Sequence, residues 1–160
     1  MAYVFKDYID ETLDDIKGNE YLELISICFH YSAFFSLIYK SKSQKIPALD
    51  KYLIRSSYKD QWPGTIGTSE GGILNLYTCN EETKKILCTH VNSLFSWNAY
   101  FGNENPEDLA FYREDKTVFF ESVVHEGECY ILNKDVENVR SIVSKEGWSW
   151  TNYTDALIYI

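Results

Sequence analysis

The chain has 160 residues, of which 45% are hydrophobic and 16% aromatic, with 15 basic and 24 acidic side chains and a net charge of −9. This composition excludes an intrinsically disordered chain, because such chains are poor in aromatic residues, and the negative charge disfavours direct binding to nucleic-acid phosphates. We expect one globular domain over residues 1–160, since no linker interrupts the sequence.

The first predicted elements are two helices. Hydrophobic side chains recur at helical spacing in residues 4–16, which predicts an amphipathic helix with an acidic stripe on its outer face. The stripe consists of Asp7, Asp10, Glu11 and Asp14. Residues 20–40 are apolar nearly all round, which predicts a buried helix at the centre of the fold. Pro47 then suits the first turn of a short helix that ends near Ile54.

Residues 59–72 are expected to form an irregular loop, which contains Trp62 beside a Pro-Gly pair. Trp62 is either a lid that packs on the core or an exposed recognition residue, and we favour packing. Residues 73–78 predict a strand. Asn80 predicts the N-cap of a helix that extends to about Trp97.

The clearest architecture lies in the second half, where residues 109–113, 117–124 and 128–132 predict three strands. The turns between them are too short for a parallel crossover, so the strands must be antiparallel. Residues 134–146 predict a helix, and the aromatic-rich residues 148–160 are expected to dock on the sheet, with a final strand as one option. The expected class is α+β: an antiparallel sheet of three to five strands packed against four to five helices, which form a single layer around the central apolar helix.

The N-terminus lacks a basic segment followed by an apolar run, so we expect no signal peptide. The longest apolar run, residues 24–39, is shorter than the roughly 20 residues that span a bilayer. A cytoplasmic address without membrane contact follows as an expectation. Reduced thiols are then expected for the four cysteines, Cys28, Cys79, Cys88 and Cys129.

No metal site and no cofactor are expected. Two Cys-x-His pairs lie on predicted helices, where residues two apart point to nearly opposite faces and cannot share an ion. A cysteine–histidine dyad is conceivable, but no cysteine lies in a glycine-rich catalytic setting. The sequence also lacks a P-loop, a dinucleotide fingerprint, Gly-x-Ser-x-Gly and His-Glu-x-x-His.

A group of side chains that could support catalysis or metal binding lies near the hairpins. His125 and Glu126 stand at a turn, and Glu107 and Asp108 precede a neighbouring strand, so these groups could line one edge of the sheet. Paired carboxylates beside a histidine can perform general acid–base work or bind a divalent cation. Acidic turns are also commonly just solvated.

Charge is distributed unevenly along the chain. Residues 1–23 carry a net charge of −5, residues 39–59 a net +5, and residues 60–160 a net −9. These segments either screen one another within the fold or provide a face that docks a charged partner.

Residues 105–113, Asn-Pro-Glu-Asp-Leu-Ala-Phe-Tyr-Arg, together with the following Phe-Phe-Glu-Ser-Val strand and His125-Glu126, resemble a group of small, uncharacterised bacterial cytoplasmic proteins. Some of that group carry sporulation-type labels, and others resemble immunity proteins that neutralise polymorphic toxins. The likeness covers roughly the second half of the chain from Trp62. It implies a bacterial source and a binding function, and it carries over no functional residue.

Two functions follow as hypotheses. The first is an acidic protein-binding protein, of the immunity type that neutralises a basic toxin such as a nuclease. Its candidate binding residues are Asp7, Asp10, Glu11, Asp14, Trp62, Glu107, Asp108, His125 and Glu126. The alternative is a small hydrolytic or metal-assisted enzyme that uses His125 and the nearby carboxylates. No catalytic residue is assigned.

Overall fold

The computed structural model describes residues 2–6, 15–41, 44–66, 70–99, 104–133 and 135–160. Within these residues, eight strands form one antiparallel sheet in the order β3-β4-β2-β5-β6-β7-β1-β8. The strands are β1 (Ala2–Lys6), β2 (Phe34–Tyr39), β3 (Leu53–Lys59), β4 (Gly72–Thr78), β5 (Glu107–Tyr112), β6 (Val118–Val123), β7 (Glu128–Ile131) and β8 (Trp148–Thr151). The α-helices are α1 (Asn19–Tyr31), α2 (Glu81–His90) and α3 (Arg140–Val143). The 3₁₀ helices are η2 (Pro47–Tyr52), η3 (Leu94–Ser96), η4 (Val124–Glu126) and η5 (Val136–Asn138).

The expected balance of strands and helices was therefore wrong. The described residues contain eight strands instead of three to five, and of their three α-helices only α1 and α2 exceed four residues. The antiparallel pairing of β5, β6 and β7 was predicted correctly. In the described part of the chain, no helix combines the length and hydrophobicity needed to cross a bilayer.

The predicted central helix over residues 20–40 is instead a helix followed by a strand. Helix α1 ends at Tyr31, and Ser32 already has extended backbone angles. Strand β2 then lies between β4 and β5, with its middle four residues buried. A strand that is covered on both faces has no alternation of polar and apolar residues, so its sequence resembles that of a buried helix.

The predicted helix at residues 4–16 begins in fact as strand β1, which lies between β7 and β8. Its partners are more than 120 residues away in sequence, so only the folded chain provides them. The acidic stripe of Asp7, Asp10, Glu11 and Asp14 lies outside the described residues.

The other boundaries were only partly predicted. Asn80 caps α2 as expected, accepting a hydrogen bond from the Thr83 backbone N–H, but the helix ends at His90 instead of continuing to Trp97. The predicted helix at residues 134–146 is reduced to η5 and α3. Strand β8 confirms that the end of the chain joins the sheet.

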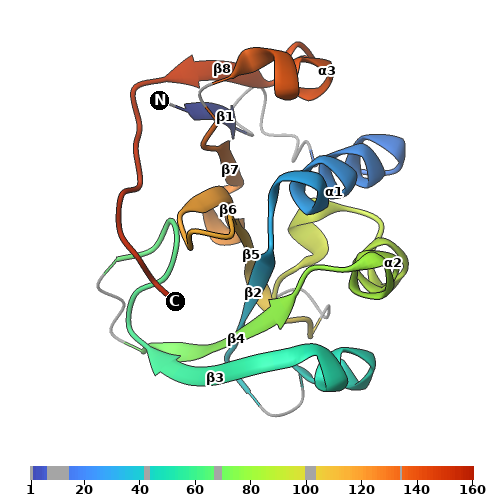
Figure 1. Ribbon diagram of the computed structural model, residues 1–160, viewed down its shortest axis with the longest axis vertical. Helices are drawn as coiled ribbons and strands as arrows, with labels where there is room; N and C mark the ends of the chain where they lie inside the picture. Colours follow the sequence, from blue (N-terminus) through green and yellow to red (C-terminus); the bar gives the residue numbers. More distant parts are fainter. Residues whose placement is uncertain (1, 7–14, 42–43, 67–69, 100–103, 134) are drawn as a thin grey trace.

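The sheet is covered on both faces (Figure 1). Helices α1 and α2 lie on one side, and residues 152–160 descend from β8 across the other. Each face has its own hydrophobic cluster: a larger one that includes Leu24, Phe111 and Phe119, and a smaller one that includes Trp62 and Tyr159. Because both faces are covered, every residue of β5 and β6 is buried.

Candidate functional site

Trp62, one of the predicted site residues, is buried, with 1% of its surface exposed. It starts a tight turn in which its backbone exchanges hydrogen bonds with Thr65, at 2.9 and 2.8 Å. Pro63 and Gly64 occupy the middle of the turn, and Gly64 has a φ of 81°, as a type II turn requires. The packing role of Trp62 is therefore confirmed.

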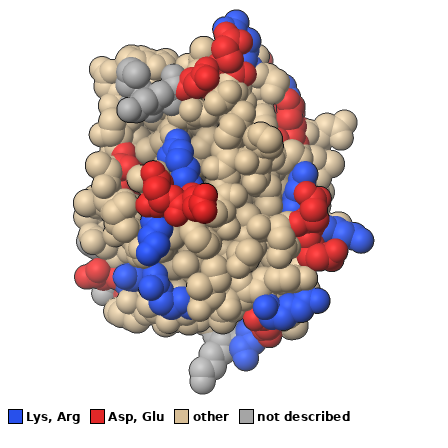
Figure 2. Space-filling view, in the orientation of Figure 1, with Lys and Arg blue, Asp and Glu red and all other residues tan. Residues whose placement is uncertain are grey.

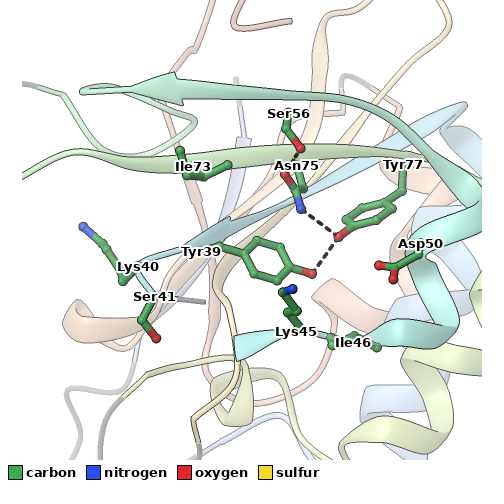
Figure 3. Close-up of a pocket in the computed structure, with 10 residues that line it drawn as sticks. All are labelled: Tyr39, Lys40, Ser41, Lys45, Ile46, Asp50, Ser56, Ile73, Asn75 and Tyr77. Carbon is green, nitrogen blue, oxygen red and sulfur yellow. Dashed lines mark hydrogen bonds between the residues drawn. The ribbon is translucent and has the colours of Figure 1, made fainter. Parts of the chain in front are cut away.

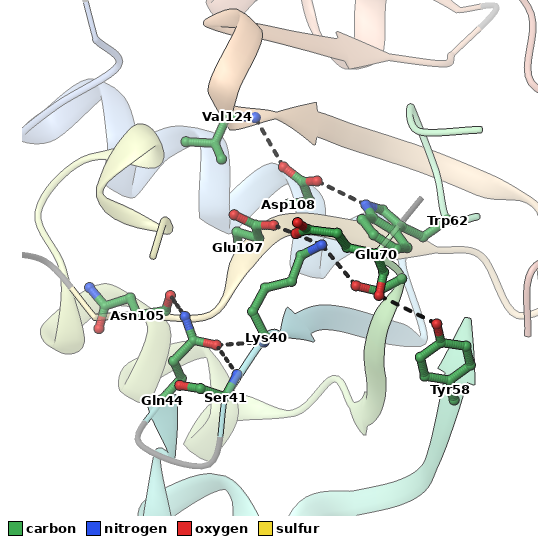
Figure 4. A network of polar contacts seen from close by, with 11 residues as sticks. Lys40, Ser41, Gln44, Tyr58, Trp62, Glu70, Asn105, Glu107, Asp108 and Val124 are labelled. Atoms are coloured by element: carbon green, nitrogen blue, oxygen red, sulfur yellow. Dashed lines mark hydrogen bonds and ion pairs between the residues drawn. The ribbon is translucent and has the colours of Figure 1, made fainter. Parts of the chain in front are cut away.

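The Trp62 indole is held by the predicted site residue Asp108 (Figure 4). Its Nε1–H donates to Asp108 Oδ2 at 2.8 Å, and the Val124 backbone N–H donates to Asp108 Oδ1 at 3.0 Å. Burial raises the pKa of Asp108, although these two hydrogen bonds oppose that shift. Both oxygens already have N–H donors, so Asp108 joins the Trp62 loop to the start of η4 and offers no oxygen free of a donor.

Glu107 lies next to a cation that sequence reasoning had not included, Lys40 at the end of β2. Lys40 Nζ is 3.9 Å from Glu107 Oε1, donates to the Gly71 carbonyl at 2.9 Å, and lies 4.9 Å from the centre of the Trp62 ring. Burial and the neighbouring charge of Asp108 raise the pKa of Glu107. Lys40 comes beside Glu107 because residues 34–39 form a strand next to β5, where the sequence predicts a helix.

Gln44 fixes the chain immediately after Lys40. Its side-chain oxygen accepts hydrogen bonds from the backbone N–H groups of Lys40 and Ser41, and its Nε2 donates to the Asn105 carbonyl at 3.0 Å. These contacts attach the end of β2 to the segment that leads into β5 (Figure 4). The cluster of Lys40, Trp62, Glu107 and Asp108 is thus a polar junction held by hydrogen bonds and an ion pair.

His125 and Glu126 lie on η4 with exposed side chains. The Val124 backbone N–H, next to His125 in the sequence, donates to Asp108 Oδ1 at 3.0 Å, so the chain at His125 lies against Asp108. Within the described ranges, however, no three His, Cys, Asp or Glu side chains are placed to hold a metal ion. The structure brings Trp62, Glu107 and Asp108 together, while Glu126 faces solvent.

The four cysteines are free thiols. Cys28 and Cys129 are fully buried in the larger hydrophobic cluster, and burial raises the pKa of each thiol well above its ordinary value. Thiols of this kind are poor nucleophiles at neutral pH. They contribute to packing.

Strand β3 is a second candidate site, and it was not predicted as a strand. It is an edge of the sheet, and none of its seven residues is buried. Ile54 and Tyr58 are 49% and 67% exposed. Figure 2 shows charges of both signs scattered over the visible face, with basic side chains gathered toward the lower end, where β3 lies in Figure 1.

Comparison of the chain with protein-family models, curated proteins and solved structures found no match.

Proposed function

We propose that this protein binds another protein by pairing β3 with an extended segment of its partner. The observation that carries the proposal is that β3 combines an open strand edge with exposed apolar side chains. An edge strand leaves one row of backbone N–H and C=O groups unpaired, and a partner strand can satisfy them while its side chains contact those of β3.

The two edges of the sheet are not equivalent. Strand β8 has four residues, whereas β3 has seven, which offers a partner a longer row of backbone groups. Long, exposed edge strands are usually protected by charge or by irregular pairing. In β3, the register shift between Leu53 and Arg55 disturbs only its beginning, and residues 55–59 pair regularly with β4.

The charge near β3 indicates the kind of partner. Lys51, Arg55 and Lys59 are all basic and at least partly exposed. They would repel the same strand of a second copy, and they would attract a segment that carries Asp or Glu. The proposed partner therefore contributes an acidic, extended segment.

The test places a photo-crosslinking amino acid at Ile54, with the same residue at Leu22 of α1 as the matched control, since both side chains are 40–50% exposed. We expect a partner to crosslink through Ile54 and not through Leu22. Mass spectrometry should map the crosslink to an acidic segment of that partner. Arg55→Glu should reduce the yield several-fold, whereas Lys85→Glu on α2 should leave it unchanged. Equal yields from both crosslinking positions would contradict the proposal.

The net charge supports a second candidate, an immunity-type protein that neutralises a basic toxin. The total charge is −9 and residues 39–59 contribute +5, so the remainder carries −14. A charge of this size speeds association with a cationic active site at low salt.

A pull-down at low and at moderate salt tests this candidate. Recovery of one basic protein that is lost as salt rises would support it, and charge reversal of Asp7, Asp10, Glu11 and Asp14 should then slow association. Arg55→Glu separates the two candidates, because it should weaken binding to an acidic segment and should not weaken binding to a basic toxin.

A further inference from the structure

A cavity of about 380 Å³ opens between the ends of β2 and β4, strand β3 and the segment that leads into η2. Its polar floor consists of Tyr39, Ser56, Asn75 and Tyr77 (Figure 3). Ile46 and Ile73 provide apolar lining. Both the volume and the mixture of an apolar wall with a few converging polar groups are typical of small-molecule sites.

The polar floor is a continuous chain of hydrogen bonds across three strands. Ser56 Oγ donates to Asn75 Oδ1 at 2.5 Å, and Asn75 Nδ2 donates to the Tyr77 hydroxyl at 3.2 Å. The Tyr77 and Tyr39 hydroxyl oxygens are 2.6 Å apart. The pairing of Ser56 with Asn75 across β3 and β4 places these two side chains on the same face.

This series of hydrogen bonds leaves one tyrosine O–H without an acceptor. Two hydroxyl groups face one another, and only one of them can donate in the single bond between them. Whichever tyrosine donates, the other O–H has no acceptor within the described part of the chain. Burial raises the pKa of both Tyr39 and Tyr77, so both remain protonated at neutral pH. The floor therefore offers a hydrogen-bond donor to a molecule in the cavity.

Opposite charges stand on the two sides of the tyrosine pair. Figure 3 shows the Lys45 side chain beside Tyr39 and the Asp50 carboxylate beside Tyr77. The negative charge of Asp50 adds to burial in raising the pKa of both tyrosines, so it acts directly on this floor. Lys40, which also lines the cavity, directs its ammonium group to the Gly71 carbonyl and Glu107.

We infer that this cavity binds a small zwitterion of the amino-acid class. Its carboxylate accepts from the tyrosine pair and lies beside Lys45, its ammonium group faces Asp50, and its side chain contacts Ile46 and Ile73. A simple anion would be opposed by Asp50, and a simple cation would leave the tyrosine donor without an acceptor.

The experiment measures binding by calorimetry and ligand-observed NMR with three matched probes. Leucine carries both charges, 4-methylpentanoate lacks its ammonium group, and 3-methylbutylamine lacks its carboxylate. Leucine should bind at least tenfold more tightly than either analogue. Failure of leucine to bind at millimolar concentration, or equal affinity for all three probes, would overturn the inference.

Variants then assign the contacts. Tyr77→Phe should weaken leucine binding about tenfold, whereas Tyr58→Phe, the same change at an exposed tyrosine outside the cavity lining, should have no effect. Lys45→Gln should weaken leucine and 4-methylpentanoate but spare the amine, and Asp50→Asn should weaken leucine and the amine but spare the acid. A uniform loss for all probes in both charge variants would indicate a structural effect and would also overturn the assignment.

Discussion

The hydroxyl group of Tyr153 donates a hydrogen bond to the carboxyl group of Glu121, joining the C-terminal segment to the middle of the sheet. Glu121 is completely buried, and Tyr153 also packs on the Tyr130 ring at a centroid distance of 4.5 Å. Burial and the nearby Asp155 raise the pKa of Glu121 from its ordinary value of 4.5 to about 8. The C-terminal segment is thus held on the sheet by a carboxyl group that is largely protonated at neutral pH.

Glu121 should make the protein less stable as pH rises. Between pH 4.5 and about 8, the folded state keeps a proton on Glu121 that the unfolded chain has released, so the free energy of unfolding falls with increasing pH. The largest slope from one such group is about 1.4 kcal/mol per pH unit. Glu121→Gln should remove this contribution, measured by urea unfolding between pH 5 and 9.

The exposed Glu114→Gln is the control, and it should keep the pH dependence of the unchanged protein. If Glu121→Gln and Glu114→Gln show the same slope, the raised pKa of Glu121 is refuted.

Trp62→Phe should destabilise the fold, because it removes the indole N–H that satisfies the buried Asp108 Oδ2. Loss of one partner from a buried, charge-assisted hydrogen bond costs about 1–3 kcal/mol. Trp150→Phe, at a position that is 53% exposed, should change the free energy of unfolding by less than about 0.5 kcal/mol.

A double-mutant cycle isolates this bond. Combining Trp62→Phe with Asp108→Asn should cost less than the sum of the two single changes, because the second change leaves no unpaired carboxylate. Strict additivity would mean that the hydrogen bond does not contribute to stability.

Gly64→Ala should be much more harmful than Gly18→Ala. Both glycines have positive φ, a backbone conformation that strains an alanine. A Cβ at Gly64 would also lie 2.6 Å from Val123 Cγ2, whereas nothing lies within 4 Å of one at Gly18. The extra overlap should add about 1–3 kcal/mol to the loss, measured by thermal or urea unfolding. Similar losses in both variants would show that the turn can move away from β6.

Asn80→Ala should destabilise α2 by about 0.5–2 kcal/mol, because Asn80 Oδ1 accepts from the Thr83 N–H and satisfies one end of the helix. Asn138→Ala, an exposed asparagine elsewhere on the surface, is the matched control and should be nearly neutral. Urea unfolding provides the comparison, and an equal, small effect of both changes would show that the cap is dispensable.

The candidate sites differ in how far sequence could predict them. Asp108 and the chain at His125 lie close together because they stand at the ends of adjacent hairpin strands, whose pairing is local and could be predicted. Lys40 and the tyrosine cavity were missed because both depend on β2 being a strand between β4 and β5. Strand β3 could not be predicted from periodicity, because residues 53–59 show no regular alternation of apolar and polar side chains.

The sequence by itself determined the antiparallel β5-β6-β7 hairpins and the Asn80 cap, because short turns and capping side chains act over a few residues. It also determined that the end of the chain joins the sheet, because so many apolar side chains would be costly to leave exposed to water. Only the tertiary structure decided that residues 34–39 are a strand and that β1 lies between β7 and β8. Their side chains are buried by residues far away in sequence, and burial on both faces removes the periodicity by which a strand is distinguished from a helix.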